Sequence, residues 1–123
     1  MHLAVDLGWI LAVAQRAGEG DPAPTDFGVP VAAVERHKAT LLDKTVYDGP
    51  VARAAALAHT LGRLRWLERS NMTVAVAVTV AYLQAAGRTV KPGRDEIGAL
   101  VDEIRREDGT TASIAAVLRS WPA

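Results

Sequence analysis

The stretch LRWLERSNMT, residues Leu64–Thr73, joins the two most apolar segments of the 123-residue chain. Before it, Pro50–Leu64 carries leucines at helical spacing, and after it, Met72–Ala86 is almost entirely apolar. A short polar turn between two buried elements is a candidate functional site, because a rigid scaffold positions it. The same residues also suit a solvated turn between two helices, with Ser70 as the N-cap of the second helix.

The composition indicates one domain without a strong charge preference. Half of the residues are hydrophobic, which is enough to bury a core without disulfides or metals. Basic and acidic residues number 14 each, so the net charge gives no general attraction to nucleic acid or to an acidic membrane. Cysteine is absent, which excludes disulfides, thiolate nucleophiles and zinc sites built on cysteine.

The chain shows no signal for export or membrane insertion. Its first residues lack the basic start, apolar run and cleavage site of a secretory signal peptide. The apolar run Val74–Leu83 is shorter than the roughly 20 residues that a membrane-spanning helix needs. We therefore expect a cytoplasmic protein that binds neither nucleic acid nor a membrane.

Helical periodicity predicts about six helices in a compact bundle. Gly18–Gly28 is rich in Gly and Pro and is predicted to be a loop, and Ala39–Gly49 is predicted to be a loop or a short hairpin. The expected helices are His2–Ala17, Val29 to about His37, Pro50–Leu64, Met72–Ala86, a helix from Arg94 or Asp95 to Asp108-Gly109, and a last helix capped by Thr110 or Thr111.

The segment Val74–Val80 carries two conflicting signals. Valines at every second position alternate with Ala and Thr, which is typical of a strand. Both alternating sets are nevertheless apolar, and the run continues to Gly87. The length and the terminal glycine favour a buried central helix, so we expect an all-α fold.

Several short features follow one another without a gap from Tyr47 to Val90. In order they are Tyr47 at the end of a loop, Arg53-Ala54-Ala55-Ala56-Leu57, His59-x-Leu61, Ala75, Thr79, Tyr82-Leu83 and Gly87, with Gly28 opening a short helix upstream. In this order the chain resembles the Fic/Doc family, most closely the small death-on-curing toxins. That resemblance implies an all-α, Fic/Doc-like domain over residues 1–123.

The signature loop of that family reads His-x-Phe-x-Asp/Glu-Gly-Asn-Lys/Gly-Arg and falls on Arg65–Thr73 in this match. The asparagine is kept as Asn71, and Leu67 is a similar apolar anchor. The other motif positions differ: Arg65 stands for the histidine base, Arg69 for the acidic Mg²⁺ ligand, Ser70 for the glycine, and Met72 and Thr73 for the Lys-Arg pair.

These departures bear directly on the family's chemistry. A general base must exchange a proton near neutral pH, whereas the guanidinium of Arg65 stays protonated. An arginine at position 69 also puts a cation where the divalent metal would be held. The resemblance therefore predicts the fold better than the reaction, and ATP with Mg²⁺ would be needed only for residual family activity. We expect no cofactor, and no spacing of His with acids suits a metal.

Three interpretations follow. The first is a catalytically degenerate Fic/Doc-like, toxin-component-like protein that binds a protein partner, such as an antitoxin-like helix laid in a groove. The second is a repurposed enzyme that acts on an anionic or nucleotide-containing substrate, with Glu68 as the only acid/base candidate of the loop. The third is a small helical domain of unknown role.

The loop also predicts an anion site. Arg65 and Arg69 are four residues apart, so they share a face if the preceding helix continues through the loop. An anion between them would relieve their repulsion, and Ser70 and Asn71 lie at the start of the next helix, whose N–H groups favour an anion.

Two histidines are candidate site residues with simpler interpretations. His59 lies within the Ala-rich helix, which favours a structural role. His37 lies between Arg36 and Lys38, and a solvated helix end is favoured over a place in a cationic cleft.

Overall fold

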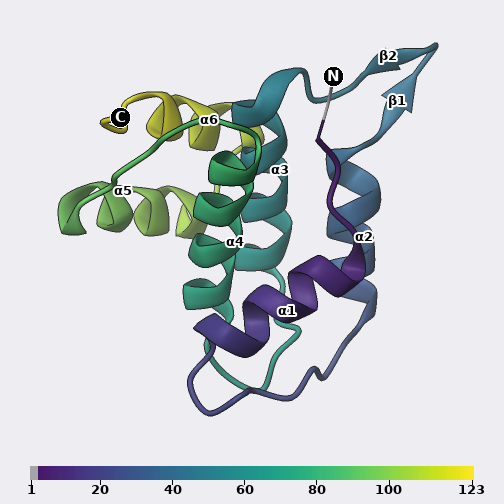
Figure 1. Ribbon diagram of the computed structural model, residues 1–123, viewed down its shortest axis with the longest axis vertical. Helices are drawn as coiled ribbons and strands as arrows, with labels where there is room; N and C mark the ends of the chain where they lie inside the picture. Colours follow the sequence, from purple (N-terminus) through teal and green to yellow (C-terminus); the bar gives the residue numbers. More distant parts are fainter. Residues whose placement is uncertain (1–2) are drawn as a thin grey trace.

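The computed structural model describes residues 3–123 and is built from helices around one core (Figure 1). Within this range the elements are α1 Leu7–Ala17, α2 Gly28–His37, β1 Thr40–Leu41, β2 Lys44–Thr45, α3 Gly49–Arg63, α4 Asn71–Ala85, α5 Arg94–Arg105 and α6 Thr111–Arg119. The expected helical class with about six helices is confirmed, and the residues expected to form a loop or a hairpin at 39–49 form a hairpin.

Helices α3 and α4 run side by side through the middle of the molecule (Figure 1). Helix α1 packs on α4, α2 packs on α3, and α5 and α6 cover the opposite side. The contact face of α3 consists mainly of alanine, and all residues of Ala54–Ala58 are buried. Small side chains allow the neighbouring helices to approach closely, and a buried α3–α4 pair positions the loop that joins them.

The conflict at Val74–Val80 is resolved in favour of the helix. Two adjacent rows of α4 side chains are buried. Val74 and Val78 form one row, and Ala75 and Thr79 form the other. The Thr79 hydroxyl donates to the Ala75 carbonyl at 2.7 Å, which satisfies a buried polar group within the helix. Burial of a uniformly apolar segment outweighs the modest β preference of its valines.

The first helix is shorter than expected. It starts at Leu7, because the Asp6 carboxylate caps it by accepting from the Trp9 amide at 2.8 Å. Residues 3–6 are not helical, and the expected start at His2 lies outside the described residues. Helix α5 likewise ends at Arg105 rather than at Asp108-Gly109.

The extended N-terminal segment is held by polar side chains of the core. The Val5 amide donates to Nε2 of His37 at 3.1 Å, and the other ring nitrogen of His37 donates to the Val34 carbonyl. The expectation of a solvated helix end at His37 is therefore wrong, because its ring is fully buried. Burial lowers the pKa of His37 below its ordinary 6.5, and Arg53 and Lys38 add to this effect.

None of the helices within residues 3–123 combines the length and apolar character needed to cross a bilayer. The hairpin pairs Thr40 with Thr45 and Leu41 with Lys44, and it projects from the helical body (Figure 1).

Lowering the pH should destabilise the protein through His37. Its pKa is lowered on folding, so the unfolded chain binds the proton more tightly. This histidine's contribution is therefore complete well above pH 6.5 and is lost as the pH falls through that value. We expect urea midpoints to decrease between about pH 7.5 and about pH 5.5, and less steeply in His37→Gln.

His59→Gln is the comparison variant: the pKa of His59 is lowered as well, so this substitution should also flatten the pH dependence, by an amount that adds to that of His37→Gln. A His37→Gln protein with the unchanged pH dependence of the wild type would contradict the assignment. Ring nitrogen chemical shifts should also show less protonation of His37 at pH 6.5 in the folded protein than in the urea-unfolded chain.

The contact between α3 and α5 should be sensitive to one added methyl group. A Cβ on Gly62 would lie 2.6 Å from Cγ2 of Ile104 and 3.4 Å from Cβ of Ala75. We expect Gly62→Ala to lower the free energy of unfolding by about 1–2 kcal/mol, because overpacking outweighs the higher helix propensity of alanine. Urea denaturation measures this change.

Gly98→Ala in α5 is the matched control, because nothing lies within 4 Å of the added Cβ. This variant should be more stable by roughly 0.5–1 kcal/mol, which is the helix-propensity gain alone. Equal effects of the two substitutions would show that α3 and α5 do not pack closely at Gly62.

Candidate functional site

The loop between α3 and α4 is a core segment rather than a solvated turn. Trp66 and Leu67 are fully buried, although polar residues surround them in the sequence. Helix α3 ends at Arg63, and the next residue, Leu64, has extended backbone at φ −108° and ψ 132°. The helix therefore does not continue through the loop, and the shared helical face assumed for Arg65 and Arg69 does not exist.

The segment at residues 19–26 runs alongside this loop and pairs with it through the main chain. The Thr25 amide donates to the Trp66 carbonyl at 2.7 Å, and the Glu68 amide donates to the Ala23 carbonyl at 3.0 Å. Pro24 and Leu67 form an isolated antiparallel bridge between them. Two loops that are distant in sequence thus form one unit at the end of the α3–α4 pair (Figure 1).

Asn71 is the centre of the loop's internal hydrogen bonding. Its side-chain oxygen accepts from the amides of Trp66 and Leu67, each at 3.0 Å. Its side-chain nitrogen donates to the Leu67 carbonyl at 2.9 Å. The amide group therefore faces the main chain of its own loop, and it closes the turn in which Trp66 and Leu67 are buried.

Ser70 does not act as the expected side-chain N-cap. It adopts the left-handed conformation at φ 66°, and its hydroxyl makes no capping bond to α4. The hydroxyl instead accepts from the Glu19 amide at 3.2 Å. The tight entry into α4 requires this backbone conformation, which turns the side chain toward the neighbouring loop.

Arg69 and Glu68 link the two loops. The Arg69 guanidinium donates to the carbonyls of Glu19 at 2.7 Å and Gly20 at 2.9 Å, and Nη1 lies 2.9 Å from Oε1 of Glu68. The same carboxylate oxygen accepts from the Ala23 amide at 2.9 Å. This amide and the charge of Arg69 lower the pKa of Glu68 below its usual range, so the carboxylate is a weak proton acceptor at neutral pH.

The structure brings all four residues predicted to bind an anion into one turn. Arg65 donates through Nη2 to the Glu68 carbonyl at 3.0 Å, and Arg69, Ser70 and Asn71 also bind groups of this chain. The observed arrangement is one in which these side chains hold the loop. Anion binding at the turn stays a prediction.

The structural role expected for His59 is confirmed. Arg36 donates to Nδ1 of His59 at 2.8 Å and to the Thr60 hydroxyl at 3.0 Å. Since arginine only donates, Nε2 of the ring carries the proton and donates to the Gly109 carbonyl at 3.3 Å. Burial and the nearby charge of Arg36 lower the pKa of His59, so the neutral ring bridges α3 and the α5–α6 turn.

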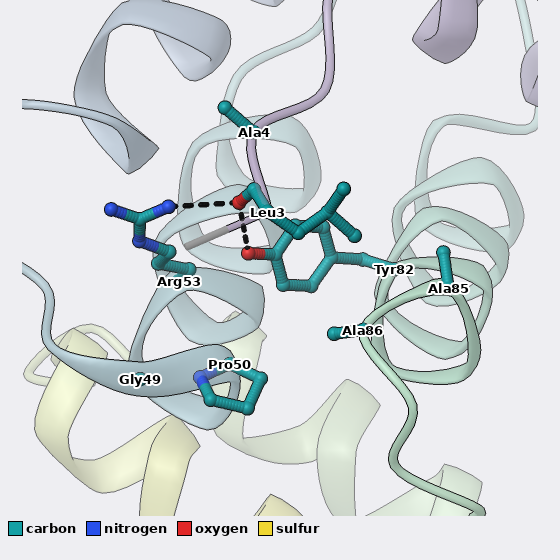
Figure 2. Close-up of a pocket in the computed structure, with 8 residues that line it drawn as sticks. All are labelled: Leu3, Ala4, Gly49, Pro50, Arg53, Tyr82, Ala85 and Ala86. Carbon is teal, nitrogen blue, oxygen red and sulfur yellow. Dashed lines mark hydrogen bonds between the residues drawn. The ribbon is translucent and has the colours of Figure 1, made fainter. Parts of the chain in front are cut away.

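A cavity that no sequence motif indicates lies at the opposite end of the α3–α4 pair (Figure 2). Arg53 and Tyr82 line it, and both donate to the Leu3 carbonyl. In the sequence, Arg53 is only one of the residues that carry the family resemblance. A single charged residue among the buried alanines of an Ala-rich helix is the sequence signal that points to this position.

Comparisons with protein-family models, curated proteins and solved structures found no match to this chain. Within residues 3–123, no three His, Asp or Glu side chains are grouped so that they could hold a metal ion.

Removing the Asn71 side chain should loosen the loop. Asn71→Ala leaves the Trp66 and Leu67 amides without their acceptor, so we expect a loss of about 1–3 kcal/mol in the free energy of unfolding. Asn71→Asp keeps the acceptor and loses only the donor to the Leu67 carbonyl. It should therefore be less destabilised than the alanine variant, as measured by urea unfolding followed through tryptophan fluorescence. Equal stability of Asn71→Ala and the wild type would contradict this role.

Proposed function

We propose that the chain is a Fic/Doc-like helical domain that has lost the family's transferase chemistry and acts in the cytoplasm by binding a protein partner. The order of elements supports the proposal. A short helix, a hairpin followed by Tyr47, an Ala-rich helix, a loop and an apolar helix occur in the order that the resemblance implies.

The proposed loss of transferase chemistry rests on one observation: the polar groups of the loop already bind partners within this chain. Arg65, Arg69 and Asn71 donate to main-chain carbonyls, and the Glu68 carboxylate is bound by Arg69 and the Ala23 amide. A transferase loop must present a base and an anion-binding group to a substrate. Here these side chains connect two loops of the same chain instead.

The hairpin and its surroundings support binding of a protein. Leu42 is 88% exposed and Leu41 is 68% exposed, and Leu42 has positive φ at 52°. A leucine in the left-handed region at a fully exposed tip costs free energy both in backbone strain and in hydration. Such a tip is understandable if a partner covers it.

A groove of about 280 Å³ continues from the hairpin toward α6. Val46 and Tyr47 line it from the hairpin side, and Ala112 and Ala115 line it from α6. Its lining is mostly apolar and includes small side chains, which suits the apolar face of an amphipathic helix. The partner that we propose is therefore a protein that contributes such a helix.

A repurposed enzyme is the second candidate, and it depends on Glu68. Its carboxylate is exposed but already paired with Arg69, and its pKa is lowered. These features make the group a poorer general base, so the geometry favours binding over catalysis.

Site-specific photocrosslinking tests the proposal. A photoreactive residue replaces Leu42, Ala112 or Ala12, of which Ala12 is exposed on α1 and serves as the control. The protein is co-expressed with the product of each neighbouring reading frame. We expect one discrete crosslinked product from positions 42 and 112 and none from position 12.

A transfer assay on the same purified complex tests the loss of chemistry. Incubation with labelled ATP and Mg²⁺ should label neither protein above a blank. Label transfer that disappears in Glu68→Ala would support the repurposed enzyme instead, and equal crosslinking from all three positions would exclude a defined partner surface.

A further inference from the structure

The second site of interest is the cavity at the end of the α3–α4 pair that lies opposite to the loop at 64–73. It has a volume of about 470 Å³ and lies between the N-terminal segment, the first turn of α3 and the last turn of α4 (Figure 2). This volume is in the range of small-molecule sites. None of the residues in the loop at 64–73 lines it.

Arg53 is a buried cation without a counter-charge. Its side chain lines the cavity, and the residue is only 4% exposed. Nη1 donates to the Leu3 carbonyl at 2.8 Å and Nε to the Tyr47 carbonyl at 3.3 Å. Within residues 3–123, no carboxylate lies within 4.0 Å of the guanidinium, and Nη2 makes no hydrogen bond. A cation that is largely removed from water is stabilised by an anion bound next to it.

The N-terminus of α3 is a second feature that favours an anion at the same place. Gly49 and Pro50, the first residues of the helix, line the cavity (Figure 2). The preceding Asp48 makes no side-chain cap to α3, and its carboxylate lies instead 3.5 Å from the Thr45 hydroxyl. A Cβ added to Gly49 would meet nothing within 4 Å, so the space next to this helix end is open. Pro50 has no N–H, so the other amides of the first turn and the helix dipole add to the positive potential of Arg53.

The remaining lining is apolar or already satisfied. Leu3, Ala85 and Ala86 present hydrocarbon to the cavity. The Tyr82 hydroxyl donates to the Leu3 carbonyl at 2.6 Å, and burial raises the pKa of Tyr82, so the phenol stays neutral. One positive charge in such surroundings matches one negative charge with an apolar body.

We propose that this cavity binds a small organic monocarboxylate, whose carboxylate group lies at Nη2 of Arg53 and the first amides of α3 and whose hydrocarbon contacts Ala85 and Ala86. The carboxylate accepts a charge-assisted hydrogen bond from Nη2, the nitrogen of Arg53 that the Leu3 and Tyr47 carbonyls leave free. A phosphate dianion would leave one negative charge unbalanced in an apolar pocket, which disfavours it. The site is independent of the proposed partner surface, so either can fail without the other.

The test uses the full chain and a series of defined probes at constant ionic strength: acetate, butanoate, hexanoate, hexanamide and inorganic phosphate. Binding is measured by calorimetry and by amide chemical shifts of Gly49 and Ala86. We expect affinity to increase from acetate to hexanoate and to be lower for hexanamide and phosphate by about tenfold or more, the equivalent of at least about 1.4 kcal/mol.

Two variants separate binding from folding. Ala85→Leu adds hydrocarbon to the cavity without touching the hydrogen bonds of Arg53, and it should weaken hexanoate binding by about tenfold or more. Ala99→Leu, an exposed position on α5, is the matched control and should bind like the wild type. Arg53→Met should lose the preference for hexanoate over hexanamide, and its folding is checked by circular dichroism.

Four results would overturn the proposal. They are the absence of binding by any carboxylate to the folded wild type, equal binding of hexanoate and hexanamide, binding of phosphate as tight as that of hexanoate, and unchanged hexanoate binding in Ala85→Leu. The first of these would leave Arg53 with the single role of holding the Leu3 and Tyr47 carbonyls.

Discussion

The close packing of α3 against α4 is the contact on which the other elements depend. Helix α4 is apolar almost all round, so it must be enclosed, and the alanines of α3 give it a neighbour at short distance. Helices α1 and α5 then cover the sides that α3 leaves open. The chain reverses direction at one end of this pair and enters the pair at the other end. Both ends contain buried polar groups that have no hydrogen-bond partner within the helices themselves.

Arginines satisfy many of these groups. Arg69 binds carbonyls of residues 19 and 20, Arg53 binds those of residues 3 and 47, and Arg63 binds those of residues 104, 106 and 107. A planar guanidinium offers five donors, so one side chain can connect main-chain acceptors that lie far apart in the sequence. These three arginines therefore act as links between segments, and among them only Arg69 also pairs with a carboxylate.

The two ends of the α3–α4 pair differ in the groups that surround their arginine charge. At the loop that joins α3 and α4, Arg69 has a carboxylate partner in Glu68, and the polar groups bind one another. At the other end, the charge of Arg53 is held by neutral carbonyls beside an open cavity. A buried charge held only by neutral carbonyls beside a cavity favours a ligand, whereas a charge with a carboxylate partner inside a hydrogen-bond network favours rigidity.

The helices could be predicted from the sequence because their signals are local. Periodic leucines, capping residues and an apolar run longer than a strand are local signals. They predict both ends of α3 and α4 to within one residue, and they predict the start of α6. The loop at 64–70 was harder, since its polar composition indicates a solvated turn while Trp66 and Leu67 are buried by the distant segment at 19–26. Likewise, the burial of His37 and the cavity beside Arg53 arise from contacts with residues 3–5, about 30 and 50 positions away. The sequence by itself determined which segments are helical and which residues carry charge. Only the tertiary structure decided which of those charges have partners, because pairing depends on segments that meet after the helices pack.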